Sequence, residues 1–366
     1  MDLPEQHAQL RSDITAALRD FLTQRRFELK QIGDELAPVM DELERFVLDG
    51  GKRLRPIFAY WGWRGAGGSD SPTNDSEHRA AITAAASLEF IQACGLIHDD
   101  VMDGSLTRRG RPAVHRHFAA LHHTQVGHGD GDAHGVALAI LLGDFALAWA
   151  DDLLRGSGFP PERLQHAWPV FERMRTELFA GQYLDLASQA YGEPNVARAR
   201  RVAVFKSAKY TVERPLQLGA ALGDGSPALM HAYSDYGLPL GEAFQLRDDV
   251  LSVFGNPDLT GKPAGDDLRE GKRTVLVAMT LERANPAQSA LLQQGLGSAE
   301  LSEENLDRLR NIIVETGALA ELETMISHLT ERSLAALTKA ADTGTVTADA
   351  AEALVQLATA ATSRVR

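Results

Sequence analysis

The sequence predicts an all-α fold, and three observations support this. Alternating runs of β-branched and polar residues closed by hairpin turns are absent. Ala, Leu, Arg, Glu and Gln dominate, and all five are good helix formers. Apolar residues recur at steps of three and four, the spacing that gives a helix one apolar face. We therefore expect a protein built from helices packed on helices.

Glycine- and proline-rich breaks divide the N-terminal half of the chain. The Gly50-Gly51 pair stops the first helical region, and another helix begins near Pro56, a residue favoured in the first helical turn. A long apolar helix then leads into a cluster of three aspartates. The expected helices cover residues 10–48 (as one or two helices), the region from about 56, and 79–103, with loops at 62–78 and 122–135.

The C-terminal half reads as further helices. Ser302 has the character of an N-cap, and Gly317 and Gly344 mark helix ends. The last helices carry no clustered catalytic residue types, so we expect them to serve packing. A single domain is expected over residues 1–366, with a core of about 45–280 and packing helices at about 300–366. The other expected helices cover 136–155, 161–190, 195–222, 227–254 and 273–294.

Composition restricts the classes of function. The 366 residues carry a net charge of −13, which argues against a general nucleic-acid or anionic-membrane binder. Cys94 is the single cysteine, so no disulfide can form within the chain. Three aspartates interrupt the apolar stretch 135–154, which we interpret as a buried helix and not as a membrane span. A polar N-terminus without a signal peptide makes the cytoplasm the expected location.

Two acidic clusters lie far apart in the sequence. The first is "LIHDDVMDGSLTRRG", residues 96–110, in which Asp99 and Asp103 share one helix face and repel each other. The second is "FQLRDDVLSVFGNPDLTGKPAGDDLREGKRT", residues 244–274, in which Asp248 and Asp249 end another apolar helix. Carboxylates without His or Cys partners suit Mg²⁺, which takes one or two carboxylates plus substrate phosphates. A phosphate-bridged magnesium site would cancel the repulsion.

Two basic clusters accompany the acidic ones. The segment "GGKRLRP", residues 50–56, places Lys52 and Arg55 after two glycines, and Arg108 and Arg109 follow the first acidic cluster. Arginine forks bind phosphate oxygens and lysine supplies a point charge. Neither the G-x-x-x-x-G-K-[ST] nor the G-x-G-x-x-G motif is present. The combined pattern therefore predicts a phosphate-bearing substrate held without either of these glycine-rich loops.

These segments, together with "GQYLDL" and "KSAKYT", occur in the order seen in trans-isoprenyl diphosphate synthases, also called polyprenyl synthetases, which the chain resembles over about residues 45–280. The resemblance implies an isoprenoid-synthase helical bundle around a deep central cavity, in a homodimer. It implies head-to-tail condensation of isopentenyl diphosphate with an allylic diphosphate (dimethylallyl, geranyl or farnesyl). It also implies about three Mg²⁺ ions with substrate bound.

The resemblance also implies residue roles. Catalysis would involve Asp99, Asp103, Lys206 and Gln245. The metal ligands would be Asp99, Asp103, Asp248 and Asp249, with Asp100 nearby. Isopentenyl diphosphate would contact Lys52, Arg55, Gln92 and Arg109, and the allylic diphosphate would contact Arg108, Lys206, Ser207, Gln245, Lys262 and Lys272. One position departs from the family pattern: Ser252 replaces the last Asp of the second motif, so we expect Asp248 to be the main ligand there, with Asp267 in support.

Product length should depend on the apolar helix face before Asp99. Cys94 and Gly95 are small, so they leave the cavity open beyond a C15 product, and Phe90 one turn deeper could form its floor. The preferred product is geranylgeranyl diphosphate (C20), with farnesyl or longer polyprenyl diphosphate as alternatives. A non-catalytic prenyl synthase subunit and a terpene cyclase remain as other classes. The histidines of residues 115–134 are interpreted as a solvated loop, with a zinc site as the alternative.

Overall fold

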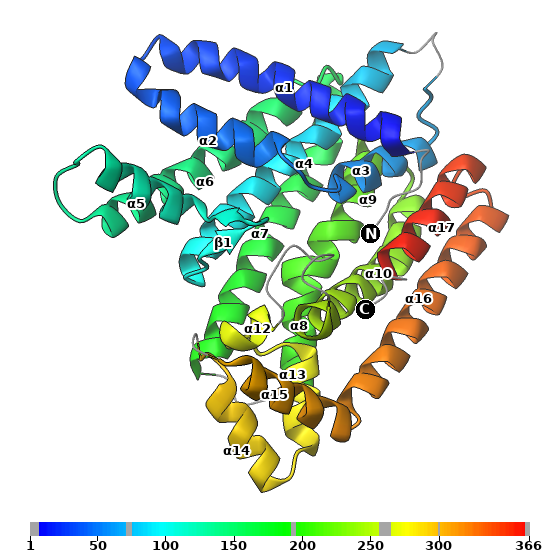
Figure 1. Cartoon of the computed structure of the whole chain (residues 1–366). Helices are drawn as coiled ribbons and strands as arrows, with labels where there is room; N and C mark the ends of the chain where they lie inside the picture. The colour runs from blue at the N-terminus through cyan, green and yellow to red at the C-terminus, as the bar shows by residue number, and fades with distance from the viewer. Residues whose placement is uncertain (1–6, 71–74, 192–194, 256–264, 299–300, 363–366) are drawn as a thin grey trace.

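The computed structural model describes residues 7–70, 75–191, 195–255, 265–298 and 301–362, and it is helical almost throughout (Figure 1). The predicted fold class is confirmed. Within these residues the sheet is limited to a two-residue antiparallel pair, β1 (Thr107–Arg108) and β2 (Arg111–Pro112). The N-terminal helices are α1 (Ala8–Lys30), η2 (Asp34–Leu36), α2 (Ala37–Leu48), α3 (Leu54–Gly65), α4 (Asp75–Met102) and α5 (Val114–Thr124).

The remaining helices complete the bundle. Those of the middle of the chain are α6 (Gly131–Arg155), α7 (Pro161–Tyr191), α8 (Val196–Val202), the π-helix η4 (Ala203–Glu213), α9 (Arg214–Leu222) and α10 (Pro227–Phe254). Those of the C-terminal part are α12 (Asp266–Arg269), α13 (Val275–Arg283), α14 (Pro286–Gly295), α15 (Glu303–Glu315), α16 (Ala318–Asp342) and α17 (Ala348–Thr362). Figure 1 shows α16 and α17 lying side by side along one flank.

Helix α4 is the central helix because apolar residues cover all of its faces. Its alanine run Ala84–Ala86 is buried, and so are Leu88 and Ile97. A helix that is apolar all round is stable only inside a protein. It packs mainly against α6 and also contacts α1 and α3. The large apolar core therefore surrounds the helix whose C-terminal end carries the first acidic cluster.

A second apolar core lies at the other end of the molecule. It joins the last turns of α10 to α12, α13, α15 and α16. Leu246, Val250 and Val253 supply the α10 side, at the spacing of one helix face. This core supports the end of α10, which carries the second acidic cluster. The predicted single-domain boundaries stay a prediction.

Several sequence-based expectations about loops were wrong. Helix α3 continues to Gly65 and α4 already begins at Asp75, so the expected loop 62–78 is shorter. The expected loop 122–135 is reduced to residues 125–130, because α5 continues to Thr124 and Asp130 caps α6 by accepting hydrogen bonds from two backbone N–H groups. Residues 273–294 form two helices, because Asn285 and Gln288 build a capping box that starts α14.

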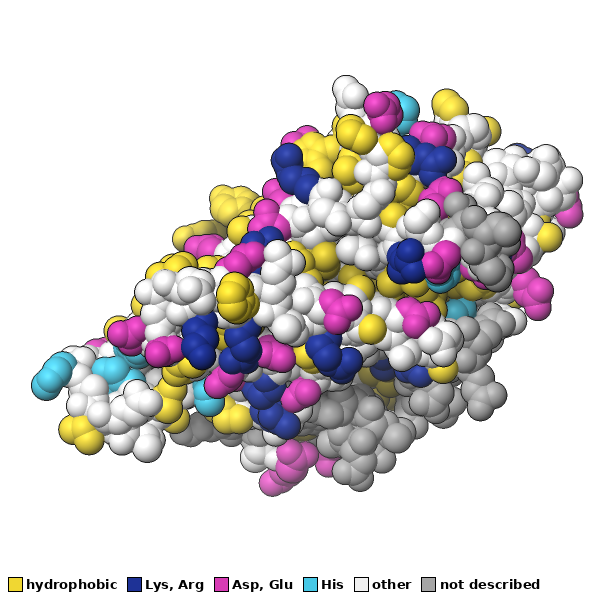
Figure 2. Space-filling model, turned by 90° about the horizontal axis from the view of Figure 1, so that it is seen from above, with side chains coloured by type: hydrophobic (Ala, Val, Ile, Leu, Met, Phe, Trp, Pro, Cys, Tyr) yellow, Lys and Arg dark blue, Asp and Glu magenta, His cyan; other side chains and the backbone are white. Residues whose placement is uncertain are grey.

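The surface carries both signs of charge. Figure 2 shows Lys and Arg side chains interspersed with Asp and Glu over one face, and histidines at the narrow tip formed by α5 and the start of α6. In the part of the chain that the structure describes, no three His, Cys, Asp or Glu side chains are arranged to hold a metal ion.

Candidate active site

The acidic end of α4 lies against two lysines from other parts of the chain. Asp99 Oδ1 is 3.1 Å from Lys206 Nζ on η4. Asp103 Oδ2 is 3.2 Å from Lys272 Nζ, in the segment between α12 and α13. Both aspartates have largely buried side chains, 14% and 2% exposed. The two ammonium groups offset part of the repulsion that the i,i+4 spacing creates.

Lys272 connects the first acidic cluster to the second. Its Nζ is 3.7 Å from Asp267 Oδ1 and 2.6 Å from Glu270 Oε2, in addition to the contact with Asp103. Ser105 Oγ donates a hydrogen bond to Glu270 Oε1 at 2.9 Å. The two acidic segments, which are far apart in the sequence, therefore meet around one lysine.

Asp249 is the most perturbed carboxyl on the α10 side. Its side chain is buried, and Gln245 Nε2 donates a hydrogen bond to its Oδ1 at 2.9 Å. Burial raises the pKa of Asp249 to about 8, and the nearby carboxylates of Asp267 and Asp248 add to the effect. A carboxyl in such surroundings gains most from a bound cation.

Ser252 does not leave a gap where the family motif has Asp. Its Oγ accepts a hydrogen bond from the backbone N–H of Asp267 at 3.2 Å, and its carbonyl accepts one from Gly265 at 2.7 Å. The hydroxyl thus anchors the start of α12. This contact fixes Asp267 beside Lys272 and within electrostatic reach of Asp249.

Asp100 supports an arginine. Its side chain is fully buried, and its carboxylate accepts hydrogen bonds from Arg108 Nε and Nη2. Burial disfavours the charged guanidinium, but the hydrogen bonds and charge of Asp100 hold the pKa of Arg108 above its usual value. Arg108 Nη2 also lies 3.9 Å from Asp99 Oδ2. The geometry favours Asp100 as the anchor of Arg108 over a metal ligand.

Lys206 is placed by α7 as well as by α4. Asp185 Oδ2 on α7 is 2.7 Å from Lys206 Nζ. Four residues earlier, Gly181 lets α7 approach the π-helix so closely that a Cβ there would lie 2.4 Å from the Lys206 backbone nitrogen. Asp185 is thus part of the acidic site. Ser207, the next residue, is buried.

The basic loop lies at the N-terminal end of α3. Arg53 adopts a left-handed conformation with φ 54° at the N-cap, and its side chain forms a buried ion pair with Glu89 on α4. Arg109 Nη1 donates hydrogen bonds to the carbonyl oxygens of Phe46 (3.1 Å) and Asp49 (2.9 Å). These contacts bring Arg109 to the loop that carries Lys52.

Arg55 and Gln92 meet around Tyr210 of the π-helix. The Arg55 guanidinium stacks over the Tyr210 ring, 4.3 Å from its centroid, and Nη2 donates to Thr211 Oγ1 at 2.9 Å. Tyr210 donates its hydroxyl proton to Gln92 Oε1 at 3.0 Å. The amide oxygen of Gln92 is thereby occupied, which leaves its N–H groups as the donors for a ligand.

The three predicted chain-length residues differ in their surroundings. Cys94 is buried, with Sγ 3.8 Å from His98 Nδ1, and burial raises the pKa of its thiol to about 12. A Cβ on Gly95 would meet no atom within 4 Å, so this position faces open space. Phe90 is buried among aromatic rings, with centroids 5.3 Å from Phe21 and 6.1 Å from Trp149.

The chemistry of this site fits magnesium. Both oxygens of Asp103 are buried and accept no hydrogen bond within the described residues. Such oxygens are costly to bury unless a cation meets them. The absence of a preformed three-ligand cluster there is consistent with Mg²⁺, which uses few protein carboxylates and completes its shell with water and phosphate.

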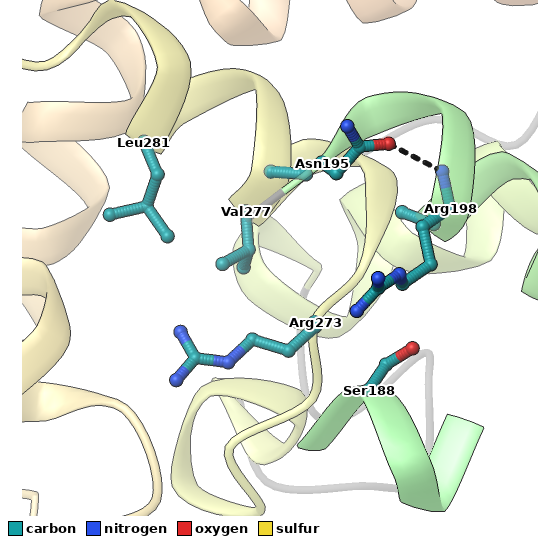
Figure 3. A pocket seen from close by; sticks show the side chains of 8 residues that line it. Ser188, Asn195, Arg198, Arg273, Val277 and Leu281 are labelled. Atoms are coloured by element: carbon teal, nitrogen blue, oxygen red, sulfur yellow. Dashed lines mark hydrogen bonds between the residues drawn. The ribbon is translucent and has the colours of Figure 1, made fainter. Parts of the chain in front are cut away.

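Lys262 is a predicted site residue that lies outside the described residues. Arg273, the residue after Lys272, lines a small pocket between α7, α8 and α13, where Arg198 and Ser188 also lie (Figure 3). The segment that carries Lys272 is therefore packed against the ends of α7 and α8.

Sequence reasoning missed some residues of this site. Glu270 and Glu89 contact Lys272 and Arg53, but neither was singled out. Glu270 sits in "LREGKRT" directly before Gly271-Lys272, a signal that was available in the sequence. Glu89 gives no such signal, because a single acid on an apolar helix reads as a solvated position.

Two acidic segments that meet at Lys272, beside an arginine-rich loop on a helical bundle, are typical of the class of trans-prenyltransferases. The polyprenyl synthetase family matches residues 37–313, and the chain belongs to that family.

Relatives with known names agree with this assignment. A geranylfarnesyl diphosphate synthase of Aeropyrum pernix is 32% identical over 287 residues, covering 78% of this chain and 82% of that protein. A geranylgeranyl diphosphate synthase of Saccharolobus solfataricus is 30% identical over 267 residues, covering 72% and 73%. The solved geranylgeranyl pyrophosphate synthase of Corynebacterium glutamicum, complexed with isoprenyl diphosphate and magnesium, is 42% identical, with a TM-score of 0.92 and 100% coverage of both chains.

Proposed function

We propose that this chain condenses isopentenyl diphosphate with an allylic diphosphate, head to tail and with Mg²⁺, to form geranylgeranyl diphosphate. One observation carries the proposal: Lys272 lies between Asp103 of the first acidic cluster and Asp267 and Glu270 of the second. Carboxylates from both acidic clusters lie close enough together to bind divalent ions that also bind one polyanionic substrate. The solved relative bound to isoprenyl diphosphate and magnesium supports this reading.

The metal ions would be held by Asp99 and Asp103 on one side and by Asp248 and Asp249 on the other, about three ions with substrate bound. Bound Mg²⁺ supplies charge stabilisation to the departing diphosphate. Lys206, Lys272 and Arg108 bind the allylic diphosphate oxygens and stabilise the negative charge that develops as the C–O bond breaks. Gln245 and Ser207 contribute hydrogen bonds, as does the ammonium of Lys262.

The second diphosphate binds at the arginine-rich loop. Arg55 and Arg109 supply planar forks that match phosphate oxygens, Lys52 supplies a point charge, and Gln92 donates from its amide nitrogen. Tyr210, by occupying the amide oxygen, orients that nitrogen. The double bond of isopentenyl diphosphate then attacks the allylic cation, and a proton is lost to the departing pyrophosphate. This chemistry requires no side-chain nucleophile.

A C20 product is favoured because Gly95 faces open space while Phe90 closes an aromatic cluster deeper in the core. Farnesyl diphosphate and longer polyprenyl diphosphates are the alternatives, and the named relatives include both C20 and C25 synthases. We also propose a homodimer located in the cytoplasm.

Incubation with Mg²⁺, isopentenyl diphosphate and each allylic primer tests the proposal, with the product alcohols sized by chromatography. We expect a C20 alcohol from dimethylallyl, geranyl and farnesyl primers. No condensation with any primer would contradict the proposed activity, and a C15 or longer main product would correct the length alone.

Asp103→Ala tests the metal role directly. We expect loss of at least about a hundredfold in kcat, because one carboxylate ligand of the bridged ions is gone. Far-UV circular dichroism should remain that of the wild type. Asp266→Ala on α12, an acidic side chain outside the proposed ligand set, serves as the control. Near-normal turnover of Asp103→Ala would rule out the role.

A further inference from the structure

The π-helix η4 carries residues of both proposed diphosphate sites, and neighbouring helices hold it at backbone contact. On the α7 side, a Cβ on Gly181 would lie 2.4 Å from the Lys206 backbone nitrogen. On the α10 side, a Cβ on Gly241 would lie 2.5 Å from the Ala208 carbonyl oxygen. Because both glycines lack a side chain, α7 and α10 can pack closely against the same stretch of η4.

Three residues of α7 spaced four apart face η4 in succession. Asp185 contacts the Lys206 ammonium, Gly181 contacts the Lys206 backbone, and Glu177 lies against the far end of the π-helix. Residues four apart share one helix face, so these three form one continuous contact line. The end of that line opposite the acidic site is the carboxylate of Glu177.

Glu177 is the centre of a buried ionic cluster. Its Oε2 accepts a hydrogen bond from Arg214 Nε at 2.7 Å, and its Oε1 accepts from Arg214 Nη2 at 2.8 Å and from Lys209 Nζ at 3.1 Å. Lys209 also lies 3.4 Å from Glu213, whose Oε1 accepts a hydrogen bond from Ser234 on α10 at 2.7 Å. The cluster thus ties the last turn of η4 to α7 on one side and to α10 on the other.

The cluster is mutually compensated. Two carboxylates face two cations, and the four side chains are only 3–17% exposed. Burial opposes ionisation of Glu177, but hydrogen bonds from Arg214 and Lys209 and their charges hold its pKa below the usual value. Removing one charge of such a set leaves another buried without compensation, which is strongly unfavourable.

An 11-residue π-helix needs such support. Its i→i+5 hydrogen bonding is rare and occurs mostly as single turns within α-helices, frequently at functional sites. Return of the last turn to the α-helical pattern would rotate the side chains upstream of it. Lys206, only three residues before Lys209, would then leave its place between Asp99 and Asp185.

We propose that Glu177 is a positioning residue for the allylic diphosphate site: by anchoring Lys209 and Arg214 it keeps η4 in its π-helical register and Lys206 in place. The inference rests on the proposed role of Lys206. Glu177 itself touches neither substrate.

Glu177→Gln is the direct test, with Glu172→Gln as the matched control. Glu172 lies on the same helix but accepts its hydrogen bond from Trp168, away from η4. We expect Glu177→Gln to raise KM for the allylic diphosphate, and the Mg²⁺ concentration for half-maximal rate, by about tenfold. KM for isopentenyl diphosphate should rise as well, because Tyr210 directly follows Lys209 in η4 and contacts both Arg55 and Gln92. The control should match the wild type.

Ser234→Ala changes no charge, so it provides a second test of the inference if Glu177→Gln does not fold. It removes the hydrogen bond to Glu213 and the one that Ser234 accepts from Gln217, which itself accepts from Arg214. Both lost bonds support the same cluster, so the same kinetic parameters should shift in the same direction by a smaller factor. Lys206→Ala is measured in parallel. A folded Glu177→Gln with wild-type KM values, beside an impaired Lys206→Ala, would overturn the inference alone. Wild-type kinetics in Lys206→Ala would instead overturn the proposed role of Lys206. If Glu177→Gln is unfolded, unchanged kinetics in Ser234→Ala would overturn the inference.

Discussion

Among single residues, Asp103 carries the largest conflict between folding and function. Burial raises the pKa of its carboxyl to about 6 and the charge of Asp99 adds to this, while the Lys272 ammonium opposes both. Neither of its oxygens accepts a hydrogen bond within the described residues. At neutral pH the ionised side chain therefore destabilises the folded state when no metal is bound. A bound metal ion would make it stabilising.

The resulting pH dependence can be measured. An unfolded chain keeps the pKa of both Asp103 and Asp249 near 3.8, whereas folding raises them to about 6 and about 8. The metal-free native state thus binds more protons than the unfolded chain. Its free energy of unfolding therefore falls as the pH rises from about 4 to 8. We predict that the rise in Tm on adding Mg²⁺ is larger at pH 8 than at pH 5.5, as followed by circular dichroism.

Asparagine at both positions supplies the control for that experiment. Asp103→Asn with Asp249→Asn removes the two titrating groups, so the Mg²⁺-induced rise in Tm should be small at either pH. An equal rise at pH 5.5 and pH 8 in the wild type would show that these carboxyls do not bind the ion.

Gly95 is the residue at which product length can be changed with least disturbance. We predict that Gly95→Phe shifts the main product from C20 toward C15, because the ring enters open space on the proposed path of the chain. Cys94→Phe must displace packed neighbours, so it should lower Tm in addition to any shortening. Chromatography of the product alcohols decides the outcome. An unchanged product from folded Gly95→Phe would place the growing chain elsewhere.

The sequence predicted which residues would meet at the site better than how each is held. Asp99 and Asp103 could be selected because charges in apolar surroundings need partners, whereas Lys206 and Lys272 were implied by the family resemblance. That Asp100 binds Arg108 and that Ser252 anchors Asp267 could not be selected, because both depend on which neighbour reaches the side chain after folding. The local sequence pattern therefore indicates that a charged side chain needs an oppositely charged partner, but it does not identify that partner.

At the scale of elements, the π-helix sets the geometry of both proposed diphosphate sites. It presents Lys206 to the acidic clusters, and Tyr210 and Thr211 to Arg55. The sequence predicted a helix over residues 195–222 but could not specify the i→i+5 pattern, because α- and π-helices draw on the same local propensities. Contacts from α7 and α10, distant in sequence, decide between them.

Gly181→Ala tests the closeness of α7 to the π-helix. Alanine normally stabilises a helix interior by about 1 kcal/mol relative to glycine. Here its methyl would lie 2.4 Å from the Lys206 backbone nitrogen, so we predict a net loss of about 1–3 kcal/mol and a higher KM for the allylic diphosphate. Urea unfolding and steady-state kinetics measure both effects. Gly95→Ala, which meets no atom within 4 Å, is the control and should not lower stability; a wild-type stability for Gly181→Ala would contradict the close contact.

At the scale of the whole molecule, α4 and α6 show why similar composition leads to different environments. Both helices reach a mean hydropathy of 1.6 over 18 residues, long and apolar enough by length and composition to cross a membrane. The α4 window is 78% buried, but the α6 window is only 39% buried. The expectation of a fully buried helix at residues 135–154 was therefore wrong for one face of α6.

The uncovered face of α6 predicts self-association. Ile140 and Leu141 are 45% and 50% exposed near the middle of this helix, and soluble monomers rarely expose large contiguous apolar patches. A two-fold symmetric contact would cover the same patch on both copies. We predict that the wild type is a dimer by analytical ultracentrifugation and that Ile140→Glu with Leu141→Glu is a monomer with unchanged helix content. Val355→Glu on α17, also an exposed apolar position, should remain dimeric. A monomeric wild type, or a double variant that stays dimeric, would exclude α6 as the interface and leave its apolar face to another partner or to a lipid surface.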